Sequence, residues 1–132
     1  MREYFEQADD FWKNNVESKK HVFSVAGKSN TRVIYASSSA CKKWFGNPYS
    51  ISKYVNEFIA PPNSVGLRFS TVWCPGARGD MLVPQIQNKT LKFATQPKRD
   101  LIHVTDVVSA IQKIIYHHDQ TGVLEVCTGN NI

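Results

Sequence analysis

The segment VIYASSSACKKWFGNPYSISK, residues 33–53, decides the fold of this 132-residue chain. Its first four residues form a short apolar run that ends in serines, as in a buried strand followed by a polar turn. Asn47 is a favourable helix N-cap and Pro48 suits the first helical position, so a helix is predicted from 48 to about 60, before Pro61 and Pro62. A strand followed by a capped helix is the repeating unit of α/β folds.

The sequence on both sides continues this alternation. Helical spacing of apolar residues predicts a helix at about 8–27 and another through Val107 to Ile115, after a short extended piece that begins near Arg99. Further elements are expected at these ranges: strand 64–73, loop 74–80, short helix 81–89, short edge strand 90–95 and strand 122–129. Alternation of this kind predicts an α/β fold with a mostly parallel sheet and flanking helices, in a single domain over 1–132.

The amino-acid composition narrows the classes of function to consider. The chain is 42% hydrophobic and 20% charged, which is ordinary for a globular protein and argues against disorder. Its net charge of +5 comes from scattered basic pairs and no basic run. Nucleic acid is therefore a weak expectation, with only the charge behind it, whereas phosphate-bearing small molecules suit the same charge.

The cysteines and the first residues of the chain bear on its cellular location. Cys41, Cys74 and Cys127 are far apart and lack C-x-x-C spacing, which argues against a metal site and a disulfide framework. No apolar run reaches membrane-spanning length, and the first ten residues do not read as a signal peptide. We therefore expect a cytoplasmic protein that does not contact membranes.

Tyr49 and Lys53 are four residues apart, so they share one face of the predicted helix. A nearby ammonium lowers the pKa of a phenol, which is about 10 when unperturbed, and a helix N-terminus favours its anion. Such a tyrosine can exchange a proton with a substrate hydroxyl, and Ser39 can hold the same oxygen. Taken alone, however, the pair is more simply an ordinary aromatic residue and a surface lysine.

Five sequence blocks, found in a set order along the chain, make the interpretation of Tyr49 and Lys53 more specific. The segments are DDFWKNNV (9–16), VIYASSSA with NPYSISK (33–40 and 47–53), GLRFSTVWCPGARGDM (66–81), KRDLIHVTDVVSAI (98–111) and GVLEVCTGN (122–130). Together they resemble the extended short-chain dehydrogenase/reductase family, the NAD-dependent nucleotide-sugar epimerases and dehydratases. The resemblance covers nearly the whole chain and implies part of a Rossmann-like, doubly wound sheet.

The resemblance also implies roles for single residues in catalysis and cofactor binding. Ser39 and Tyr49 match the catalytic serine and tyrosine, and Lys53 matches the lysine that acidifies the tyrosine and binds the nicotinamide ribose. Asn14, with Asn15 beside it, matches an asparagine near the cofactor. Phe69 and Ser70 match residues that approach the nicotinamide, and the implied cofactor is NAD or NADP.

Substrate contacts follow in the same way. Ser39 and Thr71 are expected to contact the sugar, Leu91 to Phe93 the nucleotide base, and Arg99 the diphosphate, for which a guanidinium is suited. The implied substrate is a nucleotide sugar, epimerised or dehydrated by hydride transfer with Tyr49 as the acid/base. We also expect a homodimer through the helices at about 8–27 and 48–60.

Several positions depart from the family pattern. The segment CKKWFGN between the serines and Pro48 is short, Thr71 replaces an asparagine, and Cys74 and Cys127 stand where glycine is usual. The glycine-rich G-x-x-G-x-x-G cofactor loop is missing, so we expect the chain to lack the family's N-terminal βα units and its C-terminal substrate elements, and to expose an apolar sheet edge. The alternative is a non-catalytic or degenerate domain of the same fold, used for binding or regulation.

Overall fold

The fold is known from a computed structural model, which describes residues 6–92 and 98–131. Helices and strands alternate along the chain, as the sequence predicts. In chain order they are α2 (Ala8–Phe11), the π-helix η1 (Trp12–Glu17), α3 (Ser18–Lys28), β1 (Val33–Ser38), the 3-10 segment η2 (Ser39–Gly46), α4 (Pro48–Ile59), β2 (Ser64–Phe69), β3 (Thr71–Trp73), α5 (Leu82–Gln87), β4 (Leu101–His103), α6 (Val104–Tyr116) and β5 (Gly122–Val126).

The strands form two parallel sheets. The larger has the order β1-β2-β5, with Tyr35 opposite Gly66 and Leu67 opposite Leu124, and the smaller pairs β3 with β4. The α/β fold with a parallel sheet is thus confirmed. The prediction of a single strand over 64–73 is wrong in one respect. The chain leaves the larger sheet at Ser70, and Thr71–Trp73 forms a separate strand that pairs with β4 instead of β5.

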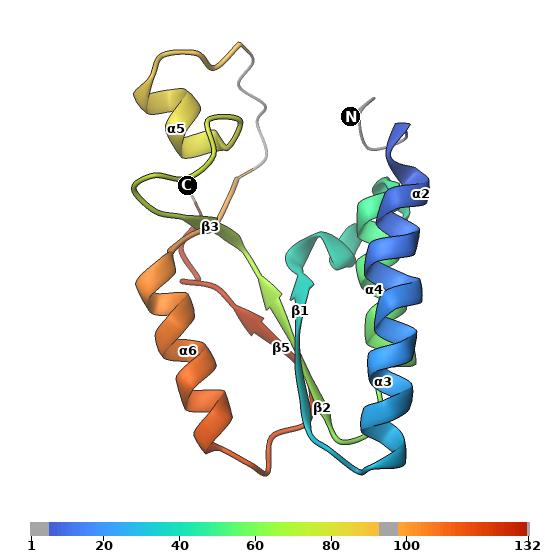
Figure 1. The fold of residues 1–132 in the computed structure, drawn as a ribbon. Coiled ribbons are helices and arrows are strands. Elements are labelled where there is room, and N and C mark those ends of the chain that lie inside the picture. The colour runs from blue at the N-terminus through green and yellow to red at the C-terminus, as the bar shows by residue number, and fades with distance from the viewer. Residues whose placement is uncertain (1–5, 93–97, 132) are drawn as a thin grey trace.

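Figure 1 shows the three layers: α3 and α4 lie on one side of the larger sheet and α6 lies on the other. Because side chains alternate along a strand, each strand contributes to both faces. Ile34, Leu67 and Val126 belong to the α6 face, whereas Tyr35, Ser37 and Arg68 belong to the opposite face.

The α6 face holds the apolar core. Its buried members are Val65, Leu67, Ile102, Val107 and Val126. The helix α6 supplies Val107 and the partly buried residues Ile111 and Ile114, at the spacing of one helical face. Burying these side chains is the main stabilising contribution that this layer makes.

Arg32 joins the end of α6 to the start of β1. Its guanidinium donates to the carbonyl oxygens of Ile114 and His117, both at 2.9 Å, and of Gln120 at 3.2 Å. These carbonyls lie at or just beyond the C-terminus of α6. A positive charge is favoured there, and the last carbonyl oxygens of a helix need hydrogen-bond donors from outside it.

The predicted helix at about 8–27 is continuous but not uniform. Its middle, Trp12–Glu17, is π-helical, and it ends at Lys28 with Asn30 in the left-handed region at φ 50°. The edge strand expected at 90–95 is not found over 90–92, and residues 93–95 lie outside the described part of the chain. No helix of the described residues is long and apolar enough to cross a membrane.

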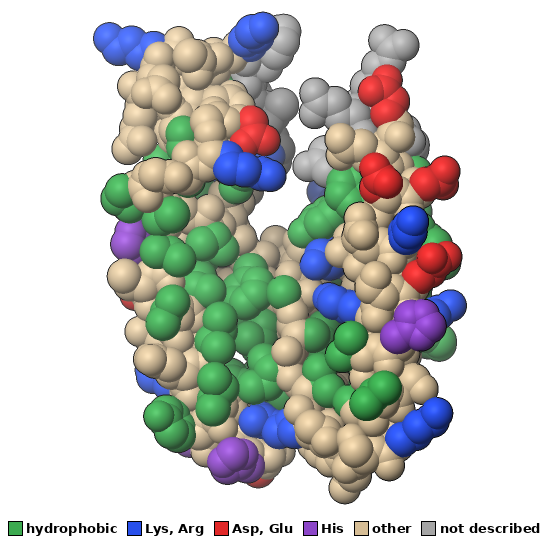
Figure 2. Space-filling view, in the orientation of Figure 1, with side chains coloured by type: hydrophobic (Ala, Val, Ile, Leu, Met, Phe, Trp, Pro, Cys, Tyr) green, Lys and Arg blue, Asp and Glu red, His purple; other side chains and the backbone are tan. Residues whose placement is uncertain are grey.

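Strand β1 is an edge of the larger sheet, which agrees with the expected open edge. Figure 2 shows the face beside it hollowed between α6 and the α3–α4 layer, with hydrophobic side chains gathered in the middle. Lys and Arg side chains lie along the margin of this hollow next to α3. An unpaired strand edge beside apolar surface is a ready place for another segment to add.

Candidate functional site

The three serines at the end of β1 have different surroundings. The buried Ser37 hydroxyl donates to the Glu57 carboxylate and lies 3.4 Å from the thiol of Cys41. The Ser38 hydroxyl accepts from the amide of Ala40 at 3.2 Å and caps η2. Ser39 is exposed at the start of η2. Of the three, Ser39 is therefore the one that is exposed.

Helix α4 begins as predicted. The Asn47 side-chain oxygen accepts hydrogen bonds from the Ser50 amide at 2.9 Å and the Ser50 hydroxyl at 3.2 Å, and Pro48 is the first helical residue. These bonds satisfy a backbone donor that the first turn would otherwise leave unpaired. Tyr49 is thereby held in the first turn of α4, where the helix macrodipole favours negative charge.

Tyr49 and Lys53 meet on one face of α4. The Lys53 ammonium lies 5.7 Å from the centroid of the Tyr49 ring, within the range of a cation–π contact. The Phe11 ring packs against Tyr49 edge-on, at 5.5 Å between centroids and 67° between planes. Burial lowers the pKa of the half-buried Lys53 ammonium. The helical spacing therefore produces the predicted pairing of the two side chains.

A second lysine, which sequence reasoning missed, adjoins this pair. The Lys19 ammonium donates to the carbonyl oxygen of Ala36 at 3.2 Å, and Lys53 donates to the same oxygen at 3.4 Å. Burial and then the charge of Lys53 lower the pKa of Lys19 to about 8. The available signal was the spacing of Val16, Lys19, Phe23 and Ala26, which puts Lys19 on the buried stripe of its helix.

Of the two adjacent asparagines, Asn15 is the one that contacts α4. Its side-chain amide donates to the Ser52 hydroxyl at 3.0 Å, and that hydroxyl donates to the carbonyl of Tyr49 at 2.8 Å. Asn14, the expected cofactor contact, is exposed. Both lie in the π-helical turn, a feature that often marks functional positions.

A buried polar cluster lies beneath α4. The Arg68 guanidinium donates to both oxygens of Glu57, at 2.8 and 2.6 Å, while Ser37 donates to the same carboxylate. Burial by itself raises the pKa of Glu57, but the hydrogen bonds from Arg68 and Ser37 outweigh it, and the pKa lies below its usual value. The cluster ties α4 to β1 and β2 through Glu57, which is one helical turn beyond Lys53.

The predicted residues Phe69, Ser70 and Thr71 lie at the end of β2 and the start of β3, and Ser70 and Thr71 contact Asp100. Phe69 is half-buried and packs against the apolar core, Thr71 opens β3, and the Ser70 hydroxyl donates to Asp100 at 3.1 Å. Asp100 also accepts from the backbone amides of Thr128 at 2.9 Å and Gly129 at 2.7 Å. Asp100, just before β4, therefore connects the chain to Ser70 after β2 and to the segment after β5. Arg99 is exposed next to it.

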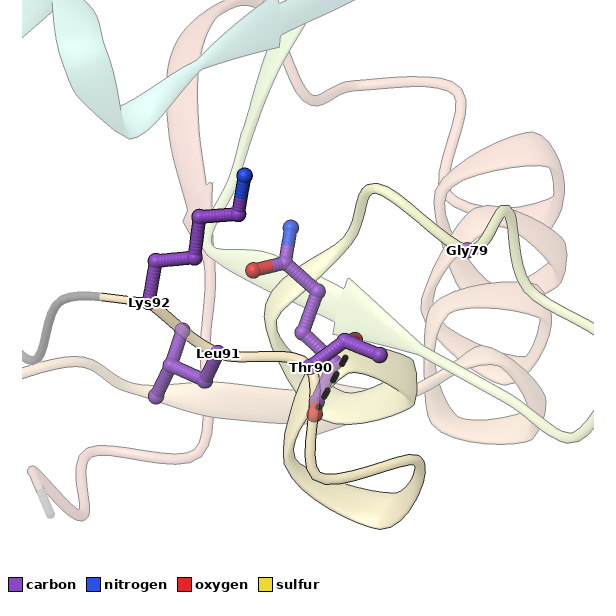
Figure 3. Close-up of a pocket in the computed structure, with 5 residues that line it drawn as sticks. Gly79, Thr90, Leu91 and Lys92 are labelled. Carbon is purple, nitrogen blue, oxygen red and sulfur yellow. Dashed lines mark hydrogen bonds between the residues drawn. The ribbon is translucent and has the colours of Figure 1, made fainter.

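A separate pocket lies in the lobe of α5. It has a volume of about 380 Å³ and is lined by Gly79, Gln85, Thr90, Leu91 and Lys92. Figure 3 shows Thr90, Leu91 and Lys92 in succession on the segment that follows α5, with the Lys92 side chain extended. Leu91 was predicted to meet the nucleotide base, and Phe93, predicted with it, lies outside the described residues. The pocket contains none of the residues around Tyr49.

Comparisons with known proteins bear on the whole chain. Residues 1–127 match the NAD dependent epimerase/dehydratase family. A search of curated proteins found no match. Among solved structures, the NAD dependent NDP-hexosamine 5,6-dehydratase TunA, of tunicamycin biosynthesis, is 21% identical with a TM-score of 0.76; the match covers 97% of this chain and 51% of that one.

Two further solved structures have the same fold. MoeE5, solved with UDP-glucose and NAD, is 25% identical with a TM-score of 0.73, over 89% of this chain and 50% of its own. The dTDP-glucose 4,6-dehydratase of Bacillus anthracis, solved with NAD, is 18% identical with a TM-score of 0.76, over 93% and 49%. The chain spans about half the length of each of these structures.

Proposed function

The chain belongs to the NAD dependent epimerase/dehydratase family, and from that premise we propose that it carries the acid/base residues of an enzyme acting on a nucleotide-activated sugar. The observation that carries the proposal is the contact between the Lys53 ammonium and the Tyr49 ring, at 5.7 Å, in the first turns of α4. The chain spans about half the length of its structural relatives. That it takes part in a complete enzymatic reaction is therefore itself proposed.

Tyr49 is the acid/base in this proposal. The Lys53 ammonium and the N-terminus of α4 both stabilise the phenolate relative to the phenol. Tyr49 can then take a proton from a sugar hydroxyl and return it later in the reaction. Ser39, exposed at the end of β1, is suited to hold that hydroxyl by a hydrogen bond.

The residues present fit one end of the dinucleotide. Lys53 forms no ion pair within the described residues and has further N–H donors for the ribose hydroxyls. Asn14, Phe69 and Ser70 are proposed as further cofactor contacts. When bound, NAD or NADP supplies hydride exchange with a sugar carbon. The sequence has no G-x-x-G-x-x-G stretch, so its residues fit the nicotinamide-ribose end and not the pyrophosphate.

The α5 pocket supports a nucleotide site. Leu91 offers an apolar side chain and Lys92 a cation in a pocket of about 380 Å³, which lies within the size range of small-molecule sites. Arg99 is exposed and can form a fork with a diphosphate. Thr71 is proposed to contact the sugar from the start of β3.

The outer faces of α3 and α4 support the proposed homodimer. Val22 and Val25 on α3 are 56% and 68% exposed, and Phe58 on α4 is 82% exposed. Exposed apolar side chains on two adjacent helices favour a protein contact. A second copy of the chain would bury them.

A non-catalytic role in binding or regulation is the second candidate. Cys74 and Cys127 follow β3 and β5, at the carboxyl ends of parallel strands where ligands of such folds bind. Each adds a side chain where glycine would leave room for close approach of a ligand.

Cofactor binding by the 132-residue chain tests the proposal. We expect NAD to bind in calorimetry, and Lys53→Gln to weaken binding about tenfold, the loss of one charge-assisted contact. With bound cofactor and UDP-glucose as a trial substrate, Tyr49→Phe should abolish turnover and leave NAD binding within about twofold. Absence of binding at millimolar NAD would exclude autonomous catalysis and favour the second candidate. Turnover retained by Tyr49→Phe would exclude the tyrosine as the acid/base.

A further inference from the structure

Four hydrogen-bond donors converge on the carboxylate of Asp100. The hydroxyl of Ser70, at 3.1 Å, and the backbone amide of Thr128, at 2.9 Å, donate to one of its oxygens. The hydroxyl of Thr128, at 3.1 Å, and the backbone amide of Gly129, at 2.7 Å, donate to the other. A carboxylate has acceptor sites for all four donors, and such a set of bonds fixes its position.

The backbone around Asp100 takes part in the same junction. The carbonyl oxygen of Asp100 accepts from the amide of Thr71 at 3.1 Å, and Asp100 forms an antiparallel bridge with Asn131. The amide of Ser70 donates to the carbonyl oxygen of Val126 at 3.1 Å. The chain changes sheets here, because β2 ends just before Ser70 and β3 begins just after it. The junction therefore lies at the carboxyl ends of β2 and β5, where ligands of parallel sheets bind.

The turn that follows β5 is shaped to receive a carboxylate. Gly129 has a φ of 80°, which glycine adopts readily, and the turn presents two successive backbone amides to the same anion. Burial by itself raises the pKa of Asp100, but the hydrogen bonds from Thr128, Ser70 and Gly129 outweigh it, and the pKa lies below its usual value. Asp100 is therefore ionised at neutral pH and can only accept hydrogen bonds.

The charge of Asp100 decides the direction of the Ser70 hydroxyl. A hydroxyl has one proton and two lone pairs, and the carboxylate has no proton to give, so the Ser70 proton points to Asp100. The Thr128 hydroxyl also donates to Asp100, and it accepts from the amide of Asn130 at 3.2 Å. Within the described residues no donor reaches the oxygen of the half-buried Ser70. Its lone pairs are therefore open to a donor group of a ligand.

We propose that Asp100 is a positioning residue with two linked roles. It holds Ser70 and the Thr128–Gly129 turn as one rigid rim at the carboxyl ends of β2 and β5. It also sets the Ser70 hydroxyl as an acceptor, so that the ligand group that meets Ser70 is a donor such as the N–H of a carboxamide. The ligand role rests on the proposed function, in which Ser70 contacts the cofactor. The rim does not, because its contacts all lie within the chain.

Amide hydrogen exchange measured by NMR tests the rim on the whole chain. Asp100→Ala removes the acceptor of both backbone amides, so exchange at Thr128 and Gly129 should become about tenfold faster, as expected for the loss of a charge-assisted hydrogen bond. Formate has the size of the lost carboxylate and should restore slow exchange, whereas chloride at equal ionic strength should not. Equal exchange in the wild type and Asp100→Ala would overturn the rim.

Two further variants make the exchange result specific. Asp119→Ala is the matched control, because Asp119 is an exposed aspartate between α6 and β5 and its loss removes the same charge. It should change exchange at Thr128 and Gly129 by less than about twofold, the size of a remote surface charge effect. Asp100→Asn keeps the side-chain shape if Asp100→Ala fails to fold. Its nitrogen cannot accept, so either orientation leaves one of the two amides without a partner. Unchanged exchange at both amides of Asp100→Asn would contradict the rim.

Calorimetry with NAD and its 3-acetylpyridine analogue tests the direction of the Ser70 hydroxyl. The analogue has a methyl ketone in place of the carboxamide and therefore lacks its N–H donors. We expect the wild type to bind NAD about fivefold more tightly than the analogue, the effect of one hydrogen bond, and Ser70→Ala to bind the two equally. Asp100→Ala should lose the same preference, and formate should restore it. A general loss of stability would not change the ratio of the two affinities in this way.

The outcomes separate this inference from the proposed function. If NAD binds but the wild type shows no preference, or Ser70→Ala keeps the preference, the direction assigned to the Ser70 hydroxyl is wrong and the proposed function stands. Absence of binding by both dinucleotides would count against the proposed function and the ligand role together. The rim is then decided by hydrogen exchange alone, because that measurement needs no ligand.

Discussion

The two faces of the larger sheet differ in chemistry although the same strands make both. On the α6 face, buried aliphatic residues pack with little polar content. On the α3–α4 face, the buried residues include Ser37, Ser50, Ser52 and Asn56, and the Glu57–Arg68 pair lies among them. The comparison indicates that the first face supplies most of the stability, whereas the second uses polar contacts to hold Tyr49, Lys53 and Lys19 in place.

The largest effect should come from the apolar face. Leu67 is 1% exposed in the centre of the core, so Leu67→Ala should lower the free energy of unfolding by about 3 kcal/mol, from lost burial and the cavity left behind. Urea denaturation followed by circular dichroism measures it. Val123→Ala, at a 39% exposed position of β5, is the control and should cost less than about 1 kcal/mol. Equal costs for the two variants would contradict an apolar core on the α6 side.

The next effect concerns the charged pair on the polar face. Glu57→Gln leaves Arg68 without its carboxylate partner and should lower the free energy of unfolding by about 2 kcal/mol at pH 7. This loss is smaller than for a fully buried pair because the Arg68 side chain is 23% exposed. The control is Glu125→Gln, whose partner Lys42 is 55% exposed, and it should cost at most about 0.5 kcal/mol.

This cost should also depend on pH. The folded pKa of Glu57 lies below its unfolded value of about 4.3. Its contribution is therefore fully present above that value and is lost as the pH falls through the folded pKa. The difference between wild type and Glu57→Gln in urea denaturation should shrink in acid. A difference that grows on acidification would mean that the folded pKa is raised.

The smallest effect has the opposite sign. Asn56 is fully buried on α4, and neither its amide nitrogen nor its oxygen has a hydrogen-bond partner among the described residues. Asn56→Leu should therefore stabilise the fold by about 1 kcal/mol, because an unsatisfied polar group is replaced by an apolar one of similar size. Ser52→Ala, which removes the bond from Asn15, should instead destabilise by about 1 kcal/mol. Destabilisation by Asn56→Leu would show that this amide has a partner in solution.

Local patterns predicted much of the site. The N-cap at Asn47, the first helical position of Pro48 and the meeting of Tyr49 with Lys53 all follow from spacing within one helix, and all three are observed. The split of 64–73 at Ser70 was missed because the apolar run continues across it. Only the pairing partners, β5 before Ser70 and β4 after it, distinguish the two strands.

The sequence by itself determined the alternation of strands and helices, the start of α4 and the family, because each rests on residues near one another or on blocks in a set order. Only the tertiary structure decided which serine is buried, that Asn15 contacts α4 while Asn14 is exposed, and that Lys19 lies beside Lys53. The physical reason is distance along the chain: Lys19 and Ala36 are 17 residues apart, and their contact exists only once α3 packs beside β1.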